Sequence, residues 1–586
     1  MTEYSGSSSQ SDRGDVPRGN LAGLIKYARF DLISGFLVFL IALPLSLSVA
    51  LAYGYPPVVG VFTSIIGGLM ATFISNAELA IKGPAAGLIV IAAGCVMDFG
   101  GDGIVGGFTD IDQAAYQAAL AVGVAAGVLQ ILFGVFRAGA LGSFFPSSVV
   151  HGMLAAIGVI IMIKMFPLTL GVSVKGTPTD LVMNAPEILS SFDLEIAAVG
   201  VVSLAIMFLW PLLKKVKSVK RLGAVPAPLV VLMVAIPLAL ALDLNAAHTN
   251  PVTLTEEPSE QLTEVRVSEE EKAEADPDAL IHVPAFGETF SALAFPDFSA
   301  LAQMKAWKWV ILFALIGTIE SMLSAKAVDI MDPWKRKTNL DRDNLAIGVA
   351  NTTCAFVGAP PMISVIVRST ANTHAGARTR FSNMYHGVYL LIFVALLPVV
   401  VGLIPIAALT AMLIYTGSRL AAPRHFLHAY RIGTEQLVLF ATTAIAVIAT
   451  NLLYGILIGI ATKLLIHIIN GVPIRSLFKP YVDAEKTDEN TYTIRAKHSA
   501  VFSNWIALRY QIEMLGLQQN CHVIVDLSGT HLIDHDVMAR LHEIEQEFTQ
   551  QGLRFEVVGL DDHRPFSEHP HAIHKKVSAS RSNIPA

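Results

Sequence analysis

Apolar runs long enough to cross a lipid bilayer dominate this sequence and limit the folds that it can adopt. A helix needs about 20 apolar residues to cross the hydrocarbon core. Such runs lie at residues 31–53, 56–75, 115–137, 146–168, 195–213, 222–242, 307–328, 386–405, 406–421, 435–453 and 454–471. Only 15% of the residues are charged, against about 25% in an average soluble domain. The chain is therefore predicted to be a polytopic α-helical membrane protein with residues 25–471 as its membrane part.

Three shorter apolar segments bring the predicted number of spans to fourteen. Residues 344–357 form one, and residues 83–97 and 358–374 form two that are interrupted by Gly or Pro. An even number of spans places both termini on the same side of the membrane. Residues 1–24 are polar and rich in Ser and Gly, which predicts a disordered tail.

Charge is segregated between the predicted loops. Alternating the spans brings these basic residues to the face that also holds the termini: Lys214, Lys215, Lys217, Lys220, Arg221, Lys335, Arg336, Lys337, Arg342, Arg378, Arg380, Arg419 and Arg424. The opposite face receives the loop 243–300, which holds ten acidic residues between Glu256 and Asp278. The positive-inside rule then predicts cytoplasmic termini. We expect the membrane to be a bacterial-type inner membrane. We interpret the acidic loop as a solvated connector rather than a cation-binding site.

Two of the segments contain helix breaks at membrane depth. Gly83-Pro84 opens the third segment, and Gly358 with Pro360-Pro361 opens the tenth. Unpaired backbone is tolerated at this depth only where protein or water surrounds it. Because proline favours the first helical position, each short helix is expected to start at its proline and to present free N–H groups at mid-membrane. Paired breaks of this kind indicate a transporter site, and helix N-termini favour anions.

Arg368 lies in the second interrupted segment, where burying it costs at least about 2.5–3.5 kcal/mol. One interpretation is that its charge forms or supports an anion site between the two helix starts. The other is an ion pair with a neighbouring helix that only holds the bundle together.

Glu320 lies near the centre of the span 307–328, on one face with Gly317 and Ser324. We predict a site for a coupling ion, H⁺ or Na⁺, at Glu320 and Ser324. The alternatives are a fixed ion pair with Arg368 or a carboxyl that stays protonated. Coupling is favoured because moving one negative charge inward against the membrane potential costs about 2.3 kcal/mol per 100 mV.

Four groups of residues resemble the sulfate permease (SulP) family of anion transporters. They are "DLISGFLVFLIALPLSLSVALAYGYPP" from Asp31, "GPAAG" from Gly83, "IGTIES" from Ile316, and "GAPP", "VRSTAN" and "AGART" in residues 358–379. The resemblance implies a seven-plus-seven inverted repeat, in which a core domain moves against a gate domain by an elevator-like shift. It also implies a homodimer.

The resemblance assigns roles to particular residues. It places the anion between the starts of the third and tenth helices, at the backbone of Ala85 and Ala86 and of Ser364, Val365 and Ile366, with Arg368 close by. Glu320 matches an acidic coupling position of the family, and Ser324 its hydroxyl neighbour. Some members have small hydroxyl residues or glycine where this chain has Val365 and Ile366, so backbone contacts are expected there rather than side-chain contacts.

The last hundred residues predict a small α/β domain after a linker at 472–490. "CHVIVDLSG" and "LRFEVVGL" read as strands, and the segment 536–550 places Val537, Leu541, Ile544 and Phe548 on one helical face. Residues 491–586 resemble the STAS domain. The residues Asp534-His535-Asp536 lack the hydroxyl that is phosphorylated in signalling members of that fold. We expect His563, His569, His571 and His574 to lie in an exposed tail.

The C-terminal region is similar to that of bacterial members associated with carbonic anhydrases, which favours bicarbonate over sulfate as substrate. A carbonic anhydrase or another cytoplasmic regulator is then an expected partner. We expect no enzyme activity, no nucleic-acid binding, and no metal or organic cofactor. The competing hypotheses are an anion channel or uncoupled exchanger, a nucleobase or dicarboxylate carrier on a related architecture, and a membrane-anchored regulatory scaffold.

Overall fold

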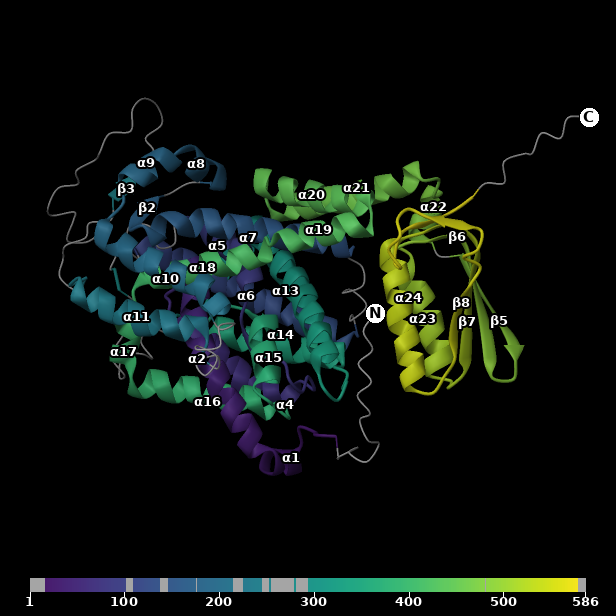
Figure 1. Ribbon diagram of the computed structural model, residues 1–586, viewed down its shortest axis with the longest axis horizontal. Coiled ribbons are helices and arrows are strands. Elements are labelled where there is room, and N and C mark those ends of the chain that lie inside the picture. Colours follow the sequence, from purple (N-terminus) through teal and green to yellow (C-terminus); the bar gives the residue numbers. More distant parts are fainter. Residues whose placement is uncertain are drawn as a thin grey trace, which may run out of the picture. The chain divides into compact units, whose positions relative to one another are not determined.

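A computed structural model describes most of the chain (Figure 1). The described residues are 16–101, 109–137, 146–174, 177–213, 225–244, 252–254, 279–280, 294–479 and 481–577. The chain divides into two compact units. The first comprises residues 1–138, 165–176 and 184–415, and the second comprises residues 139–164, 177–183 and 416–586.

Helices occupy all seven apolar segments predicted in the first half of the chain. They are α2 (Ala28–Tyr53); α3 (Val59–Ile66), η1 (Gly67–Ala71) and α4 (Thr72–Ile74) in sequence; η2 (Ala86–Leu88) with α5 (Ile89–Asp98); α6 (Asp110–Val135); α7 (Ser147–Thr169); α10 (Leu194–Leu213); and α11 (Ala227–Ala241). The short helices α8 (Pro178–Met183) and α9 (Ala185–Ser190) lie between α7 and α10.

Helices also occupy the seven segments of the second half. They are α13 (Met304–Met331), α14 (Leu340–Phe356), α15 (Ile366–His374), α16 (Phe381–Leu396) followed by α17 (Pro398–Gly402), α18 (Ile406–Leu420), α20 (Thr434–Ala449) and α21 (Leu452–Ile469). The break between α16 and α17 falls before Pro398, since proline supplies no N–H to continue the helix. The helix α19 (Pro423–Ile432), which the apolar runs did not predict, precedes α20.

Six of the described helices are long and apolar enough to cross a membrane: α2, α6, α7, α10, α13 and α21. The remaining apolar helices are shorter, including the second and third segments and α11, α16 and α20. A polytopic membrane protein is thus supported, while fourteen spans and the inverted repeat stay predictions.

The predicted disordered tail is wrong for its last residues. Helix α1 (Leu21–Lys26) begins inside it, capped by the Asn20 side chain. The backbone before α1 is also held in place, because Gly19 N donates to Glu78 Oε1 at 3.0 Å. Residues 1–15, the basic connection at 214–221 and most of the acidic loop lie outside the described residues. From that loop, β3 (Val252–Leu254) pairs in parallel with β2 (Val172–Val174).

The C-terminal residues form the α/β domain predicted for them (Figure 1). Its strands are β5 (Tyr481–Asp488), β6 (Thr491–Ala500), β7 (His522–Ile533), β8 (Phe555–Val558), β9 (His563–Pro565) and β10 (His574–Lys576), ordered β5-β6-β7-β10-β9 with β8 also paired to β7. The helices α23 (Trp505–Ile512), continued by η6 (Glu513–Leu517), and α24 (His535–Gln550) follow β6 and β7. All four apolar residues predicted on one face of α24 are buried in the domain core.

Two expectations for this region are wrong. The predicted linker at 472–490 contains α22 (Ile474–Phe478) and β5, which pairs antiparallel with β6, so the sheet begins before residue 491. The four histidines do not lie in an exposed tail, because two of them belong to β9 and β10, and His563 is buried with its Nε2 3.2 Å from Thr530 Oγ1. Strand pairing with β7 was not visible in this polar, His-rich stretch.

Candidate functional site

The two interrupted segments meet in the first unit through a short pair of strands. β1 (Lys82–Pro84) and β4 (Met362–Ser364) pair antiparallel, with Lys82 opposite Ser364 and Pro84 opposite Met362. Val365 N also donates to Ile81 O at 2.9 Å. Each strand leads directly into a short helix, so the N-termini of η2–α5 and of α15 emerge from one buried strand pair.

The helices do not begin at the prolines, which corrects that expectation. Pro84 is the last residue of β1, and Pro360-Pro361 precede β4. The residues after the breaks first form strands, because two extended segments can satisfy each other's backbone groups where water is excluded. Ala85 and Val365 are the N-caps, and Ala86 and Ile366 are the first helical residues.

The first turns of both helices lack a side-chain cap. Neither Ala85 nor Val365 supplies a side-chain cap to the first turn. The Ile366 side chain is 42% exposed, whereas every residue of β1 and β4 is buried. Uncapped N–H groups at a helix start carry partial positive charge and suit an anion.

Asparagine side chains complete the hydrogen bonding of the strand pair. Asn351 of α14 accepts from Met362 N at 2.7 Å and donates to Met362 O at 3.1 Å. Asn383 of α16 accepts from Lys82 N at 3.1 Å, and Asn372 of α15 donates to Leu79 O at 3.0 Å. These amides replace the neighbouring strands that a two-stranded sheet lacks, so they fix the positions of both helix starts.

Arg368 lies against β1 and is 1% exposed. Its Nη1 donates to Ser64 Oγ at 2.9 Å, and Ser64 Oγ lies 2.8 Å from Ser46 Oγ. A Cβ on Gly83 would lie only 2.4 Å from Arg368 Nη1, so glycine at this position makes room for the guanidinium. Within the described residues, Arg368 Nε has no hydrogen-bond partner and no carboxylate is paired with the guanidinium. The ion pair considered from the sequence is therefore not formed.

Glu320 lies on α13 against the start of η2. A Cβ on Gly87 would lie 2.1 Å from Glu320 Oε1, and Glu320 Oε2 is buried without a partner among the described residues. The predicted neighbour Ser324 is also buried. Another hydroxyl of α13 reaches β4, because Ser321 Oγ accepts from Ser364 N and donates to Ser364 Oγ, each at 3.2 Å. Sequence reasoning missed Ser321, although it directly follows Glu320.

A buried ion pair beside Ser364 was also missed. Lys82 Nζ lies 2.6 Å from Asp343 Oδ1 of α14, and both side chains are at most 3% exposed. Lys82 Nζ also donates to Ser364 Oγ at 2.5 Å. The signal was present in the sequence, since Lys82 immediately precedes the Gly-Pro break and Asp343 lies next to the segment 344–357.

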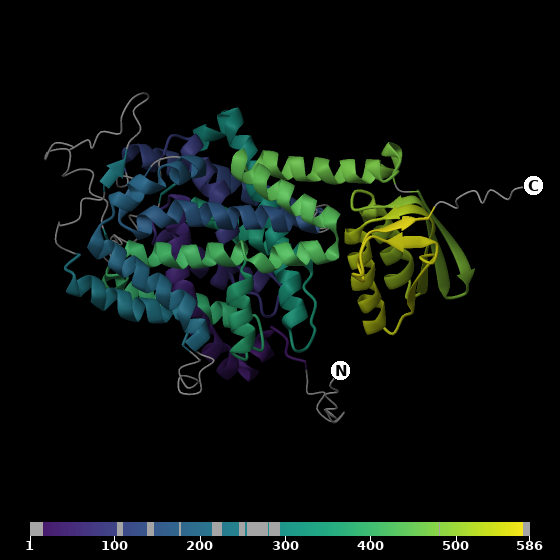
Figure 2. The ribbon, with the colours of Figure 1, turned by 45° about the horizontal axis from the view of Figure 1, so that its top comes forward.

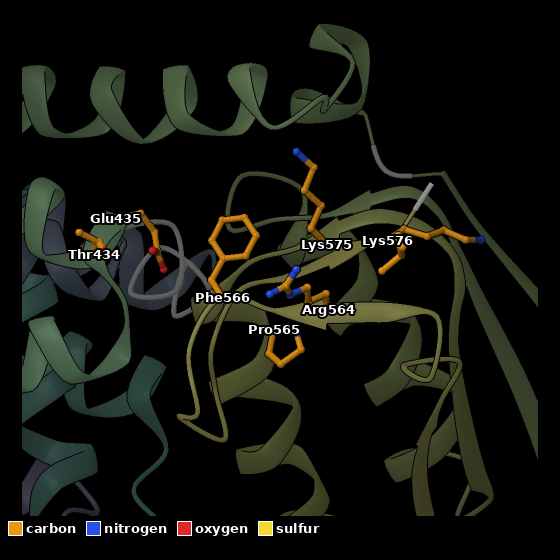
Figure 3. Close-up of a pocket in the computed structure, with 8 residues that line it drawn as sticks. Thr434, Glu435, Arg564, Pro565, Phe566, Lys575 and Lys576 are labelled. Carbon is orange, nitrogen blue, oxygen red and sulfur yellow. The ribbon is translucent and has the colours of Figure 1, made fainter. Parts of the chain in front are cut away.

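A cavity of about 500 Å³ lies elsewhere, in the second unit (Figure 3). It is lined by Thr434, Glu435, Arg564, Pro565, Phe566, Lys575, Lys576 and Val577. Lys576 is directed away from Phe566 and donates to Ser528 O at 2.6 Å, and Lys575 Nζ donates to Asn470 Oδ1 at 3.2 Å. None of the residues predicted from the sequence to bind the anion lines this cavity.

Comparison with known proteins identifies the family. The model of the Sulfate permease family matches residues 29–445, which is most of the chain and contains both strands and both helix starts. The chain belongs to the Sulfate permease family. It is an anion transporter in the membrane and not an enzyme, as predicted.

The relatives differ in the anion that their names state. The chain is 25% identical to the putative sulfate transporter YvdB of Bacillus subtilis, over 74% of this chain and 72% of that protein. It is 20% identical to the bicarbonate transporter BicA of Picosynechococcus, over 74% of this chain and 69% of that protein.

Solved structures show the same fold. The transmembrane domain of BicA matches with a TM-score of 0.57 and 19% identity, over 74% of this chain and 98% of that one. The murine anion transporter Slc26a9 in its inward-facing state matches with a TM-score of 0.63 and 15% identity, over 92% of this chain and 88% of that one.

Proposed function

We propose that the protein is a secondary active transporter of a small inorganic anion, with bicarbonate slightly favoured over sulfate, driven by Na⁺ or H⁺. The observation that carries the proposal is the β1–β4 pair, which joins two uncapped helix starts beside the buried Arg368. No carboxylate of the described residues pairs with this guanidinium. Each helix terminus contributes about half a positive charge. Together with the buried Arg368 they favour an anion.

In this proposal the anion lies against the backbone of Ala85 and Ala86 on one side and of Ser364, Val365 and Ile366 on the other. Arg368 supplies the full positive charge. These positions are supported by the way the strand pair brings the two segments together. Backbone recognition also agrees with the apolar side chains at 365 and 366.

Glu320, with Ser324, is proposed to bind the coupling cation. The support is the carboxylate oxygen that is buried against the first turn of η2 and has no partner in the described part of the chain. A cation at this carboxylate would compensate the negative charge of the substrate during inward movement against the membrane potential. An elevator-like movement of a core domain with spans 1–4 and 8–11, within a seven-plus-seven repeat of fourteen spans, would carry both ions across.

The remaining assignments follow the family resemblance. We propose that the C-terminal α/β domain is a STAS domain, that the termini are cytoplasmic in a bacterial-type inner membrane, and that the protein forms a homodimer. A carbonic anhydrase or another cytoplasmic regulator is the proposed partner of this domain.

Uptake by proteoliposomes tests the function. Purified protein should accumulate labelled bicarbonate, and sulfate more weakly, when an inward Na⁺ or H⁺ gradient is imposed, with labelled succinate as the dicarboxylate comparison. Glu320→Gln should abolish the dependence on the gradient while leaving downhill anion exchange. If Glu320→Gln transported with an unchanged cation dependence, the coupling role would be wrong, and gradient-independent wild-type uptake would favour an uncoupled exchanger or channel.

A further inference from the structure

The buried ion pair beside the proposed anion site is placed to control the charge of that site. Lys82 lies opposite Ser364 in the strand pair, and its Nζ donates to Ser364 Oγ. Ser364 directly precedes Val365, the N-cap of α15. The ammonium group therefore contacts the strand residue that leads into one of the two helix starts.

Asp343 is held so that it cancels the charge of Lys82. Its Oδ1 accepts from Ser75 Oγ at 2.5 Å and lies 2.6 Å from Lys82 Nζ, and its Oδ2 accepts from Ser364 Oγ at 3.3 Å. Both oxygens are thus satisfied, which makes the buried carboxylate tolerable in its ionised form. The pair contributes no net charge.

In the described part of the chain, the other charged side chains placed against β1 and the start of η2 are Arg368 and Glu320. His386 of α16 is buried with no partner for either ring nitrogen among the described residues, and we count it as neutral because an unpaired charge there would be costly. Asp329 lies partly exposed towards the end of α13, where its carboxylate bonds to Thr338. When Glu320 binds its cation, Arg368 carries the uncompensated charge against the strand pair in the described part of the chain.

We propose that Asp343, by cancelling the charge of Lys82, leaves Arg368 as the charge of the site and so keeps the site selective for singly charged anions. The helix termini add partial charges but no net charge, since each helix dipole also has a negative end. With Lys82 cancelled by Asp343, one negative charge neutralises Arg368, whereas a dianion would leave a net negative charge in a medium of low dielectric constant. This inference rests on the proposed function and specifies its substrate class. It agrees with bicarbonate rather than sulfate as the preferred anion.

The test is the ratio of sulfate to bicarbonate apparent affinity, measured in proteoliposomes as inhibition of labelled uptake of one anion by the other. Asp343→Asn leaves the charge of Lys82 uncompensated and should raise the ratio by about tenfold or more, which corresponds to about 1.4 kcal/mol. Lys82→Met leaves the charge of Asp343 and should lower the ratio. The double variant removes both charges and should return the ratio close to that of the wild type.

A purely structural role would weaken both anions together and would not give shifts of opposite sign. Gel filtration in detergent identifies variants that do not fold. If one single variant fails to fold, the other can still be compared with the wild type and the double variant, so the inference is still tested. An unchanged ratio in folded Asp343→Asn or Lys82→Met, or a wild type that prefers sulfate, would overturn it. A wild type that transports neither anion would instead overturn the proposed function.

Discussion

Glycine at two positions lets charged side chains approach the backbone of the proposed site. Gly83 accommodates Arg368, and Gly87 accommodates Glu320. From the sequence, Gly83 was interpreted only as a helix break. The structure adds that a side chain there would collide with the guanidinium, so a substitution would displace the charge even if the strand still formed.

Gly87→Ala should displace the Glu320 carboxylate and destabilise the protein by about 1–3 kcal/mol, because the new methyl group would lie within 2.1 Å of Oε1. Cation-dependent uptake should fall more than total anion exchange. Measuring melting temperature and uptake in proteoliposomes checks both effects.

The matched control introduces Gly87→Ala into the Glu320→Ala variant, which lacks the carboxylate that the new methyl group would collide with. The alanine should then cost much less stability, since the two positions are in contact and their effects should not add. Equal costs in the two backgrounds would show that Glu320 does not lie against Gly87.

Among the helices and strands, α21 and α24 are connected by a buried charge network within the second unit, where α21 also lies beside α20 (Figure 2). Lys463 of α21 pairs with Asp536 and lies 3.4 Å from Asp534 Oδ2, and all three side chains are at most 3% exposed. Asp534 caps α24 by accepting from Val537 N, and Asp536 Oδ1 accepts from Ser147 N at the start of α7. These contacts tie the C-terminal domain to two apolar helices.

Lys463→Met should destabilise the second unit by about 3–5 kcal/mol, because it leaves two buried carboxylates without their cation. Thermal unfolding of the full-length protein in detergent measures the loss. Lys497→Met is the control, since Lys497 pairs with Asp483 at 2.5 Å but both side chains are more than half exposed. It should cost no more than about 1 kcal/mol, and equal effects of the two variants would contradict the network.

Low pH should weaken the contacts that Asp536 makes with Lys463. Burial by itself would raise the pKa of Asp536, but Lys463, with Arg540 and His535, holds that pKa well below the ordinary range. A carboxylate with a depressed pKa contributes stability above its ordinary pKa of about 3.9, and this contribution is lost as the pH falls below that value.

The melting temperature of the wild type should therefore drop as the pH falls below about 4, and Asp536→Asn should remove part of that drop. Burial also lowers the pKa of His569 and His571. Acidification below about pH 6.5 therefore destabilises the fold through these two histidines, in the wild type and in the variant alike. An identical acid response of the variant and the wild type would contradict the role of Asp536.

At the scale of the whole molecule, orientation in the membrane depends on the segregation of charge. The basic connections and the termini are predicted on the cytoplasmic face, and the acidic loop on the opposite face. In a Cys521→Ser background, where Cys95 and Cys354 are buried, single cysteines can report on each face. Ser8→Cys should react with a membrane-impermeant maleimide only after permeabilisation, whereas Ser259→Cys should react in intact cells. Reaction of both residues from the same side would contradict the seven spans predicted between them.

Much of the architecture was predictable because it depends on local pattern. The apolar segments became helices, the face of α24 with Val537, Leu541, Ile544 and Phe548 is buried, and the two breaks lie together. The predictions failed where pairing partners are distant in sequence. β5 and β10 are polar strands whose place in the sheet depends on β6 and β7, and α1 begins in a segment that composition marked as disordered.

Hydrophobic periodicity and charge in apolar runs are local properties, and they were enough to predict a membrane transporter and to select Arg368 and Glu320. Which side chains pair with each other depends on contacts between segments that are far apart in the sequence. Lys82 and Asp343 are separated by 261 residues and meet only when β1 pairs with β4 and α14 packs beside them. The energy of a buried charge depends on what surrounds it, so the net charge of the proposed site followed from the folded structure and not from the residues alone.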